Sequence, residues 1–144
     1  MQIVDNSFAR VTYYAEGHYI EFHYKRFGTS AEFRDAWTQA GMFAAKNKVT
    51  RWLSDSRKMA VIKPEDQKWF SEELSPKVRS QMPGKDVHAA ILLDAGVFAQ
   101  VSMKNIVDGL QKVRTSADGQ MIAVYFKDEA AAKEWLLNPV LTEK

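Results

Sequence analysis

Three aspartates, Asp55, Asp94 and Asp128, each come at the end of a predicted strand, and carboxylates at such positions can bind a divalent cation. Ligands of open α/β sheets usually bind at the carboxyl ends of the strands, where three carboxylates could share one ion. Asp94 and Asp128 are nevertheless good turn or helix-cap residues. Asp55 can instead pair with Arg57 or Lys58. We therefore expect structural roles for these aspartates, with no metal and no cofactor.

The other candidates for acid–base chemistry are three scattered histidines, His18, His23 and His88. A catalytic or metal-binding histidine needs a second titratable partner in the fold. His23 stands near Glu21 and Lys25 on the polar face of a predicted strand, which is typical of solvent exposure. His88 opens an apolar strand, where a structural hydrogen bond is expected. The chain also has no cysteine, no G-x-S-x-G motif and no glycine-rich phosphate loop, so we predict that it is not an enzyme.

A strand, a basic loop and a helix start are expected over residues 52–70, WLSDSRKMAVIKPEDQKWF. The helix begins at Pro64, whose missing N–H would have no partner in a first helical turn. The two acids that follow place negative charge at the positive end of the helix dipole and would repel unsuitable partners. Arg57 in the loop offers a fork-shaped contact for an anion. We predict a binding surface formed by Asp55, Ser56, Arg57, Glu65 and Asp66.

Residues 9–27 alternate between apolar and polar in the manner of an antiparallel hairpin with a turn at Glu16-Gly17. Aromatic residues lie on both faces of this hairpin. A hairpin at the edge of a sheet cannot bury both faces, so some rings should be exposed for a partner. Because twofold dimers dominate among oligomers, we predict a homodimer formed through the hairpin. The aromatic residues are Tyr13, Tyr14, Tyr19, Phe22, Tyr24 and Phe27.

Strands and helices should alternate after the hairpin. A helix capped by Ser30 is expected over 31–46, in which Gly41 would allow close approach to a sheet. The helix that begins at Pro64 should kink or restart at Pro76. The remaining strands are expected at 50–54, 87–93 and 121–126, and the remaining helices within 98–113 and after Asp128. This order predicts an α/β fold in which an N-terminal antiparallel hairpin precedes strand–helix units, forming a mixed, largely parallel sheet with packed helices.

Length and composition narrow the classes of protein further. A chain of 144 residues, 46% of them hydrophobic, suits one domain over residues 1–144. A formal charge of +2 is too close to neutral to indicate a nucleic-acid-binding stripe. No apolar run approaches the ~20 residues that cross a bilayer, and the start of the chain has no signal-peptide pattern. We expect a cytoplasmic domain that binds no nucleic acid and has no transmembrane segment.

The element order and three motifs resemble the SpoIIAA-like (STAS-like) superfamily, in particular its small uncharacterised bacterial members. The first motif is the stretch from Asp55 and Arg57 to the helix start at Pro64-Glu65-Asp66-Gln67. The second is SMKNIVDGL, and the third is the closing YFKDEAAAKEWL. The resemblance implies a SpoIIAA-like fold and a non-enzymatic partner in regulation. Some members are switched by phosphorylation of a serine at a helix start, but residues 61–66 contain no hydroxyl there, so this switch is not carried over.

The resulting hypothesis is a non-catalytic regulatory or protein-interaction module. The alternative is a protein that binds a small apolar or lipid-like ligand under residues 98–110, where Phe98 and Met103 would line a pocket. A third possibility is an enzyme that uses the three strand-end aspartates with a metal. A deep apolar pocket would favour the second of these hypotheses, and an exposed apolar or charged patch the first.

Overall fold

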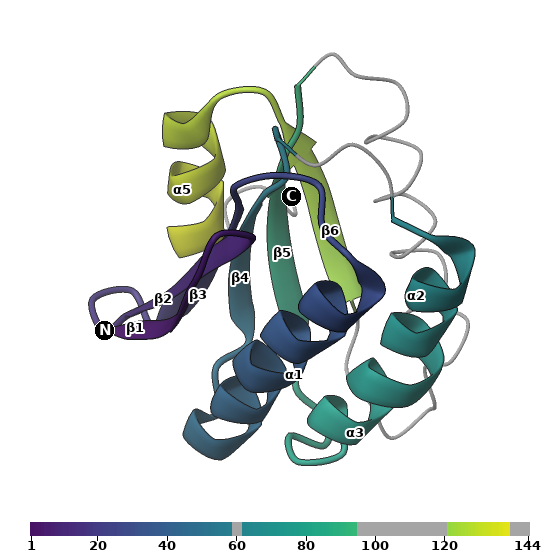
Figure 1. Cartoon of the computed structure of the whole chain (residues 1–144). Coiled ribbons are helices and arrows are strands. Elements are labelled where there is room, and N and C mark those ends of the chain that lie inside the picture. The colour runs from purple at the N-terminus through teal and green to yellow at the C-terminus, as the bar shows by residue number, and fades with distance from the viewer. Residues whose placement is uncertain (59–61, 95–120, 139–144) are drawn as a thin grey trace.

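The structure is a computed structural model that describes residues 1–58, 62–94 and 121–138, with helices on both faces of a six-stranded sheet (Figure 1). The order of the strands in the sheet is the order of the chain. They are β1 (Gln2–Asp5), β2 (Ala9–Tyr14), β3 (Tyr19–Tyr24), β4 (Arg51–Asp55), β5 (Val87–Leu92) and β6 (Met121–Phe126). β1, β2 and β3 pair antiparallel, whereas β3 to β6 run parallel. This confirms the expected mixed α/β sheet that begins with an antiparallel hairpin.

The helices divide between the two faces of the sheet. α1 (Ser30–Asn47), α2 (Pro64–Trp69), the π-helical turn η1 (Phe70–Leu74) and α3 (Ser75–Arg79) lie on one face, and α5 (Glu129–Leu137) covers the other (Figure 1). The helix expected within 98–113 lies outside the described residues. Within the residues that the structure describes, no helix is long and apolar enough to cross a membrane.

α1 begins with a capping box one residue earlier than expected. The Thr29 side chain accepts a hydrogen bond from the Glu32 backbone N–H at 3.1 Å, and the Thr29 N–H donates to Glu32 Oε1 at 3.0 Å. These two bonds satisfy donors that a helix start otherwise leaves unpaired. The expected cap, Ser30, is free for another contact and donates to the carboxylate of Asp66.

The expected interruption before Pro76 takes the form of the π-helical turn η1. Proline has no N–H to donate, and its ring would clash with the carbonyl four residues earlier in a regular helix. The Ser75 N–H therefore reaches back five residues to the Phe70 carbonyl, which widens the helix just before the proline. α2, η1 and α3 consequently form one interrupted helical segment across the face of the sheet.

The larger apolar core lies between the sheet and α1. Trp37 stacks on Phe22 with ring centroids 4.1 Å apart, and its Nε1–H donates to the buried Tyr24 hydroxyl at 2.8 Å. Gly41 does allow a close approach, but to α3 and not to the sheet, because a Cβ there would lie 2.9 Å from a methyl of Val78. The position of Gly41 thus sets how closely α1 and α3 pack.

The hairpin of β2 and β3 is present as expected, but it does not lie at the edge of the sheet. β1, which the sequence pattern did not indicate, pairs with the outer side of β2. Tyr19, Phe22 and Tyr24 are buried, and only Tyr14 and Phe27 remain exposed among the hairpin aromatics, at 38% and 49%. The aromatic surface on which the homodimer was predicted is therefore small.

Candidate functional site

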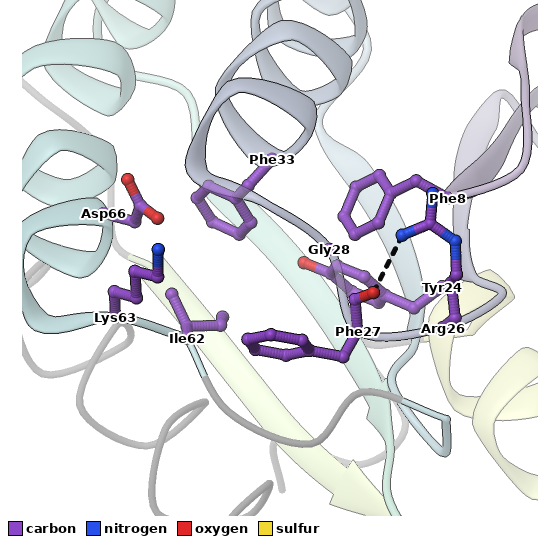
Figure 2. A pocket seen from close by; sticks show the side chains of 9 residues that line it. All are labelled: Phe8, Tyr24, Arg26, Phe27, Gly28, Phe33, Ile62, Lys63 and Asp66. Carbon is purple, nitrogen blue, oxygen red and sulfur yellow. Dashed lines mark hydrogen bonds between the residues drawn. The ribbon is translucent and has the colours of Figure 1, made fainter.

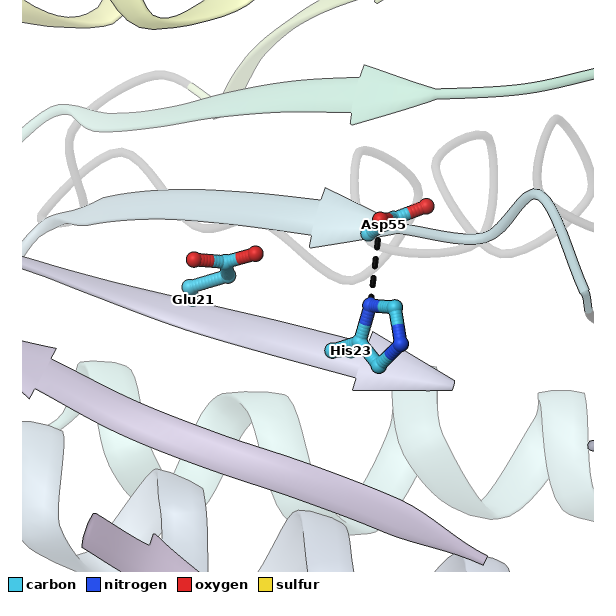
Figure 3. A group of neighbouring side chains, drawn as sticks. All are labelled: Glu21, His23 and Asp55. Carbon is cyan, nitrogen blue, oxygen red and sulfur yellow. Dashed lines mark hydrogen bonds and ion pairs between the residues drawn. The ribbon is translucent and has the colours of Figure 1, made fainter. Parts of the chain in front are cut away.

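A histidine and a buried aspartate meet where β3 and β4 end. The parallel register places His23 directly opposite Asp55, and His23 Nδ1 lies 3.0 Å from Asp55 Oδ2. The Asp55 residue is 2% exposed, whereas the His23 side chain is 21% exposed. The aspartate is thus buried and the histidine is partly exposed, with its Nδ1 directed at the carboxylate (Figure 3).

Arg57 binds the same carboxylate in a bidentate manner from the turn that follows β4. Its Nε donates to Asp55 Oδ1 at 2.9 Å and its Nη2 to Asp55 Oδ2 at 2.7 Å. Nη2 also lies 3.3 Å from Glu129 Oε1, at the start of α5 on the same face. The pairing of Asp55 with Arg57 that the sequence suggested is confirmed. Arg57 additionally links the end of β4 to α5.

The charge of Asp55 follows from two opposing effects. Burial is the largest single influence and would raise the pKa of the carboxyl, but the hydrogen bonds and positive charge of Arg57 together outweigh it and hold the pKa below its ordinary value. An ionised carboxylate only accepts hydrogen bonds, so His23 Nδ1 carries the proton of the pair. His23 Nε2 has no hydrogen-bond partner among the residues that the structure describes.

Glu21 completes the polar cluster on this face of the sheet. It precedes His23 by two residues on β3, so both side chains point to the same side. One ligand atom each from Glu21, His23 and Asp55 lies within 4.8 Å of the others (Figure 3). Within residues 1–58, 62–94 and 121–138, Asp55, Asp94 and Asp128 do not form such a group. Asp128 instead caps α5 by accepting from the Ala131 N–H at 2.9 Å, the role that its position suggested.

Two of the five residues predicted to form a binding surface lie on the surface of the molecule. Arg57 has 41% of its side chain exposed, and Glu65 is exposed at the start of α2. Asp55 and Ser56 are buried, and the Ser56 hydroxyl shares a hydrogen bond with that of Ser54 at 3.1 Å. Asp66 is also buried.

The buried carboxylate of Asp66 joins α2 to α1. It accepts from the Ser30 hydroxyl at 2.7 Å and from Arg34 Nε at 2.9 Å. Arg34 in turn lies over the ring of Trp69, 5.4 Å from its centroid. Asp66 therefore acts within the fold, and Glu65 is the acid of this pair that faces solvent.

An apolar depression opens beside the loop that follows β3 (Figure 2). Its cavity of about 20 Å³ has room for a water molecule but not for a lipid. Phe27, 49% exposed, forms one wall, and Lys63 stands on the rim without an ion-pair partner among the described residues. The pocket predicted under residues 98–110 lies outside the described residues. Other lining residues are Phe8, Tyr24, Arg26, Gly28, Phe33, Ile62 and Asp66.

The predicted binding surface did not include His23, Glu21 or Phe27. The sequence placed the first two on a solvent-exposed strand face and Phe27 among the aromatic residues of the hairpin. Alternation along β3 does place Glu21 and His23 on one face. Which residue of β4 stands opposite them depends on the register of two strands separated by a helix, and no local pattern reveals it. The exposure of Phe27 likewise depends on how the loop before α1 folds.

Comparison of the chain with protein-family models, curated proteins and solved structures gives no significant match. The geometry of the chain itself must therefore support any functional hypothesis.

Proposed function

We propose that this chain is a cytoplasmic, non-catalytic interaction module of SpoIIAA-like (STAS-like) type that binds a protein partner at the carboxyl edge of its parallel strands. The observation that carries the proposal is Phe27, a large apolar side chain left 49% exposed on this edge. It lies beside Lys63, which has no ion-pair partner within the described part of the chain. We call Phe27, Arg57, Lys63 and Glu65 the docking surface. An N-terminal hairpin followed by parallel strands and packed helices agrees with the layout that the resemblance to this superfamily implies.

The chemistry of the neighbouring side chains supports a binding role over catalysis. The Asp55 carboxylate is already occupied by Arg57 and His23. The nearby hydroxyls of Ser54 and Ser56 are buried and bonded to each other, which does not suit a nucleophile. If His23 acted as a general base, it would therefore need a nucleophile supplied by another molecule.

The docking surface indicates the chemistry of the partner. An aromatic side chain that is half exposed gains most from an apolar contact, and Arg is favoured at interfaces because its planar head binds carboxylates. Lys63, which has no ion-pair partner among the described residues, favours an acidic partner segment, whereas Arg57 already binds Asp55 and lies beside Glu129. Glu65 would oppose a second acidic group near the start of α2, which adds selectivity.

Affinity purification from the native cytoplasm followed by native mass spectrometry tests this proposal. The wild-type chain should retain one recurring protein, and Phe27→Ser and Lys63→Glu should each lose it. Met42→Ser is the matched control, because Met42 is also a large apolar residue with 39% exposure but lies on α1, outside the docking surface. A small molecule released on denaturation, with no recurring protein, would contradict the proposal and favour the ligand-binding alternative.

We further propose a homodimer through a small apolar patch at the opposite end of the hairpin. Exposed Tyr14 stacks on Tyr19 with ring centroids 4.9 Å apart, and Leu137, 40% exposed, lies with Tyr19 against Gly17. Light scattering after gel filtration should give twice the monomer mass, and Tyr14→Ser with Leu137→Ser should give the monomer mass. A monomeric wild-type chain at high concentration would refute the dimer without bearing on the docking surface.

A further inference from the structure

The polar cluster on the α5 side of the sheet contains one imidazole and two carboxylates, which are groups that commonly bind metal ions. Glu21, His23 and Asp55 bring their ligand atoms within 4.8 Å of one another on two neighbouring strands (Figure 3). The parallel register holds His23 opposite Asp55, and the period of two along β3 adds Glu21 to the same face. We propose that these three side chains form a binding site for a divalent transition-metal ion.

The charges around the cluster favour an added cation. Arg57 pairs with Asp55, and Lys133 pairs with Glu129 at 2.9 Å. Glu21 is partly buried and forms no ion pair with a described residue. Among the described residues, its carboxylate accepts one hydrogen bond, from the Tyr14 hydroxyl at 3.3 Å. Lys133 is close enough to Glu21 to interact with it electrostatically, but its ion pair is with Glu129. Glu21 therefore still carries part of the desolvation cost of a partly buried carboxylate, which a bound metal would offset.

Arg57 is the competitor that such an ion must displace. Its guanidinium now occupies both oxygens of Asp55, which is where a metal would bind. Glu129 lies 3.3 Å from Nη2 and is an alternative acceptor for the displaced guanidinium. Arg57 can therefore move from the carboxylate of Asp55 to that of Glu129 while a metal binds Oδ2 of Asp55. Metal binding then does not leave the guanidinium of Arg57 without a carboxylate partner.

The ligand set indicates which ions suit the site. Zinc binds imidazole nitrogen and carboxylate oxygen at about 2.0–2.2 Å, so the three donors must draw together from their present spacing. Glu21 can move because its long bond to Tyr14 is weak. The imidazole disfavours Ca²⁺ and Mg²⁺, which prefer oxygen ligands, and with one histidine and two carboxylates Zn²⁺, Co²⁺ and Mn²⁺ are the class expected. Three protein ligands leave a coordination position open to water.

Metal binding has a specific signature at His23. Before binding, Nδ1 donates its hydrogen to Asp55, as the ionised carboxylate requires. A metal at Nδ1 replaces that hydrogen, so the imidazole proton must move to Nε2. Nitrogen NMR of the His23 ring distinguishes the two tautomers. A merely structural histidine would keep its Nδ1–H form in the presence of metal.

The experiment is calorimetric titration of the full, untagged chain with Zn²⁺, together with nitrogen NMR of the histidine rings. We expect one site per chain. Glu21→Gln and His23→Gln should each weaken binding about 10-fold or more, since even outer-shell partners of metal sites are worth that much. His18→Gln is the matched control, because His18 lies elsewhere, beside Tyr13 and Lys48, and its loss should leave the affinity unchanged.

Arg57 and Glu129 test the exchange itself. Glu129→Gln removes the charge of the alternative acceptor and should weaken Zn²⁺ binding, whereas Arg57→Gln removes the competitor and should strengthen it. Arg57→Gln also leaves Asp55 buried without its cation, so its fold is checked by circular dichroism, and Glu129→Gln provides the test if it unfolds. Zn²⁺ binding that is absent, or that Glu21→Gln and His23→Gln leave unchanged, would overturn the site. This inference does not rest on the docking surface, whose test involves no metal.

Discussion

At the scale of single residues, the contact between Trp37 and Tyr24 is a buried hydrogen bond that two aromatic residues share. Burial raises the pKa of the Tyr24 hydroxyl well above its usual range, and the bond from Trp37 only partly opposes this effect. The folded chain therefore keeps the Tyr24 proton at a pH where the unfolded chain, with a pKa of about 10, loses it. The contribution of Tyr24 to the free energy of unfolding is therefore complete below pH ~10 and declines as the pH rises beyond that value.

Tyr24→Phe should show both consequences of this contact. The substitution leaves the indole N–H of Trp37 buried without an acceptor, and we expect a loss of about 1–3 kcal/mol at neutral pH. The decline in the free energy of unfolding above pH ~10 should also become shallower, because the tyrosine no longer titrates. Urea unfolding from pH 7 to 11 measures both effects. An unchanged alkaline slope would show that Tyr24 does not control it.

Glu32 in the capping box is expected to have the opposite pH dependence. Hydrogen bonding from Arg26, then from the Thr29 backbone, lowers the pKa of Glu32 to about 2. Its contribution to stability is therefore present above the unfolded value of 4.5 and is lost as the pH falls through about 2. Glutamine can keep the capping geometry but not the charge. Glu32→Gln should lower the melting temperature at pH 7 and flatten the pH dependence of the melting temperature between pH 4.5 and 2. Plots of melting temperature against pH that stay parallel for the variant and the wild type would contradict this prediction.

At the scale of elements, Asp66 ties α2 to α1 through Ser30 and Arg34. Replacing it by alanine removes two hydrogen bonds from a buried carboxylate, and bonds to charged groups contribute about 1.5–3 kcal/mol each. We expect Asp66→Ala to lower the free energy of unfolding by at least the contribution of one such hydrogen bond, about 1.5–3 kcal/mol. Its neighbour Glu65 is exposed in the same first turn of α2.

Glu65→Ala is the control for this prediction. Both substitutions remove a negative charge from the first turn of α2, an effect worth only about 0.3–1 kcal/mol at an exposed site. The difference between the two variants in urea unfolding therefore reports the contacts of Asp66 with α1. Equal losses in both variants would show that the helix dipole, and not the tie between helices, accounts for the role of Asp66.

The elements that were predicted correctly have local signals. The hairpin turn at Glu16-Gly17, the proline at the start of α2 and the cap at Asp128 each act within a few residues, so their sequence pattern contains the physical cause. β1 was missed although Asn6 carries a turn signal, since its side chain accepts from the backbone N–H groups that begin β2. A strand of four residues is too short for alternation to indicate it.

The features that the sequence did not reveal depend on residues that are distant along the chain. Gly41 signals a close approach, but only the packed structure shows that α3 is the neighbour. Asp66 and Glu65 are alike in sequence, and Asp66 is buried because Arg34 and Ser30 stand opposite it on another helix. The pairing of His23 with Asp55 depends in the same way on the register of β3 and β4.

At the scale of the whole molecule, the sheet separates two apolar clusters of different size. The cluster under α1 and α3 extends over most of the sheet and includes Trp37. The cluster under α5 is smaller, and its main contributions from that helix are Ala132, Trp135 and Leu136. A short helix held by a small cluster should open at a lower free energy than the rest of the fold.

Leu136→Ala tests whether α5 opens as a separate unit. Leu136 is fully buried, and its truncation should cost about 2–5 kcal/mol of the packing that holds α5. Because β4 is also covered on its other face by the larger cluster, it should keep its protection while α5 is open. Hydrogen exchange followed by mass spectrometry should therefore show faster exchange over residues 129–137 in this variant and little change over residues 51–55. Equal acceleration of both segments would mean that the two layers unfold together, and α5 would then be as much a part of the cooperative fold as the central strands.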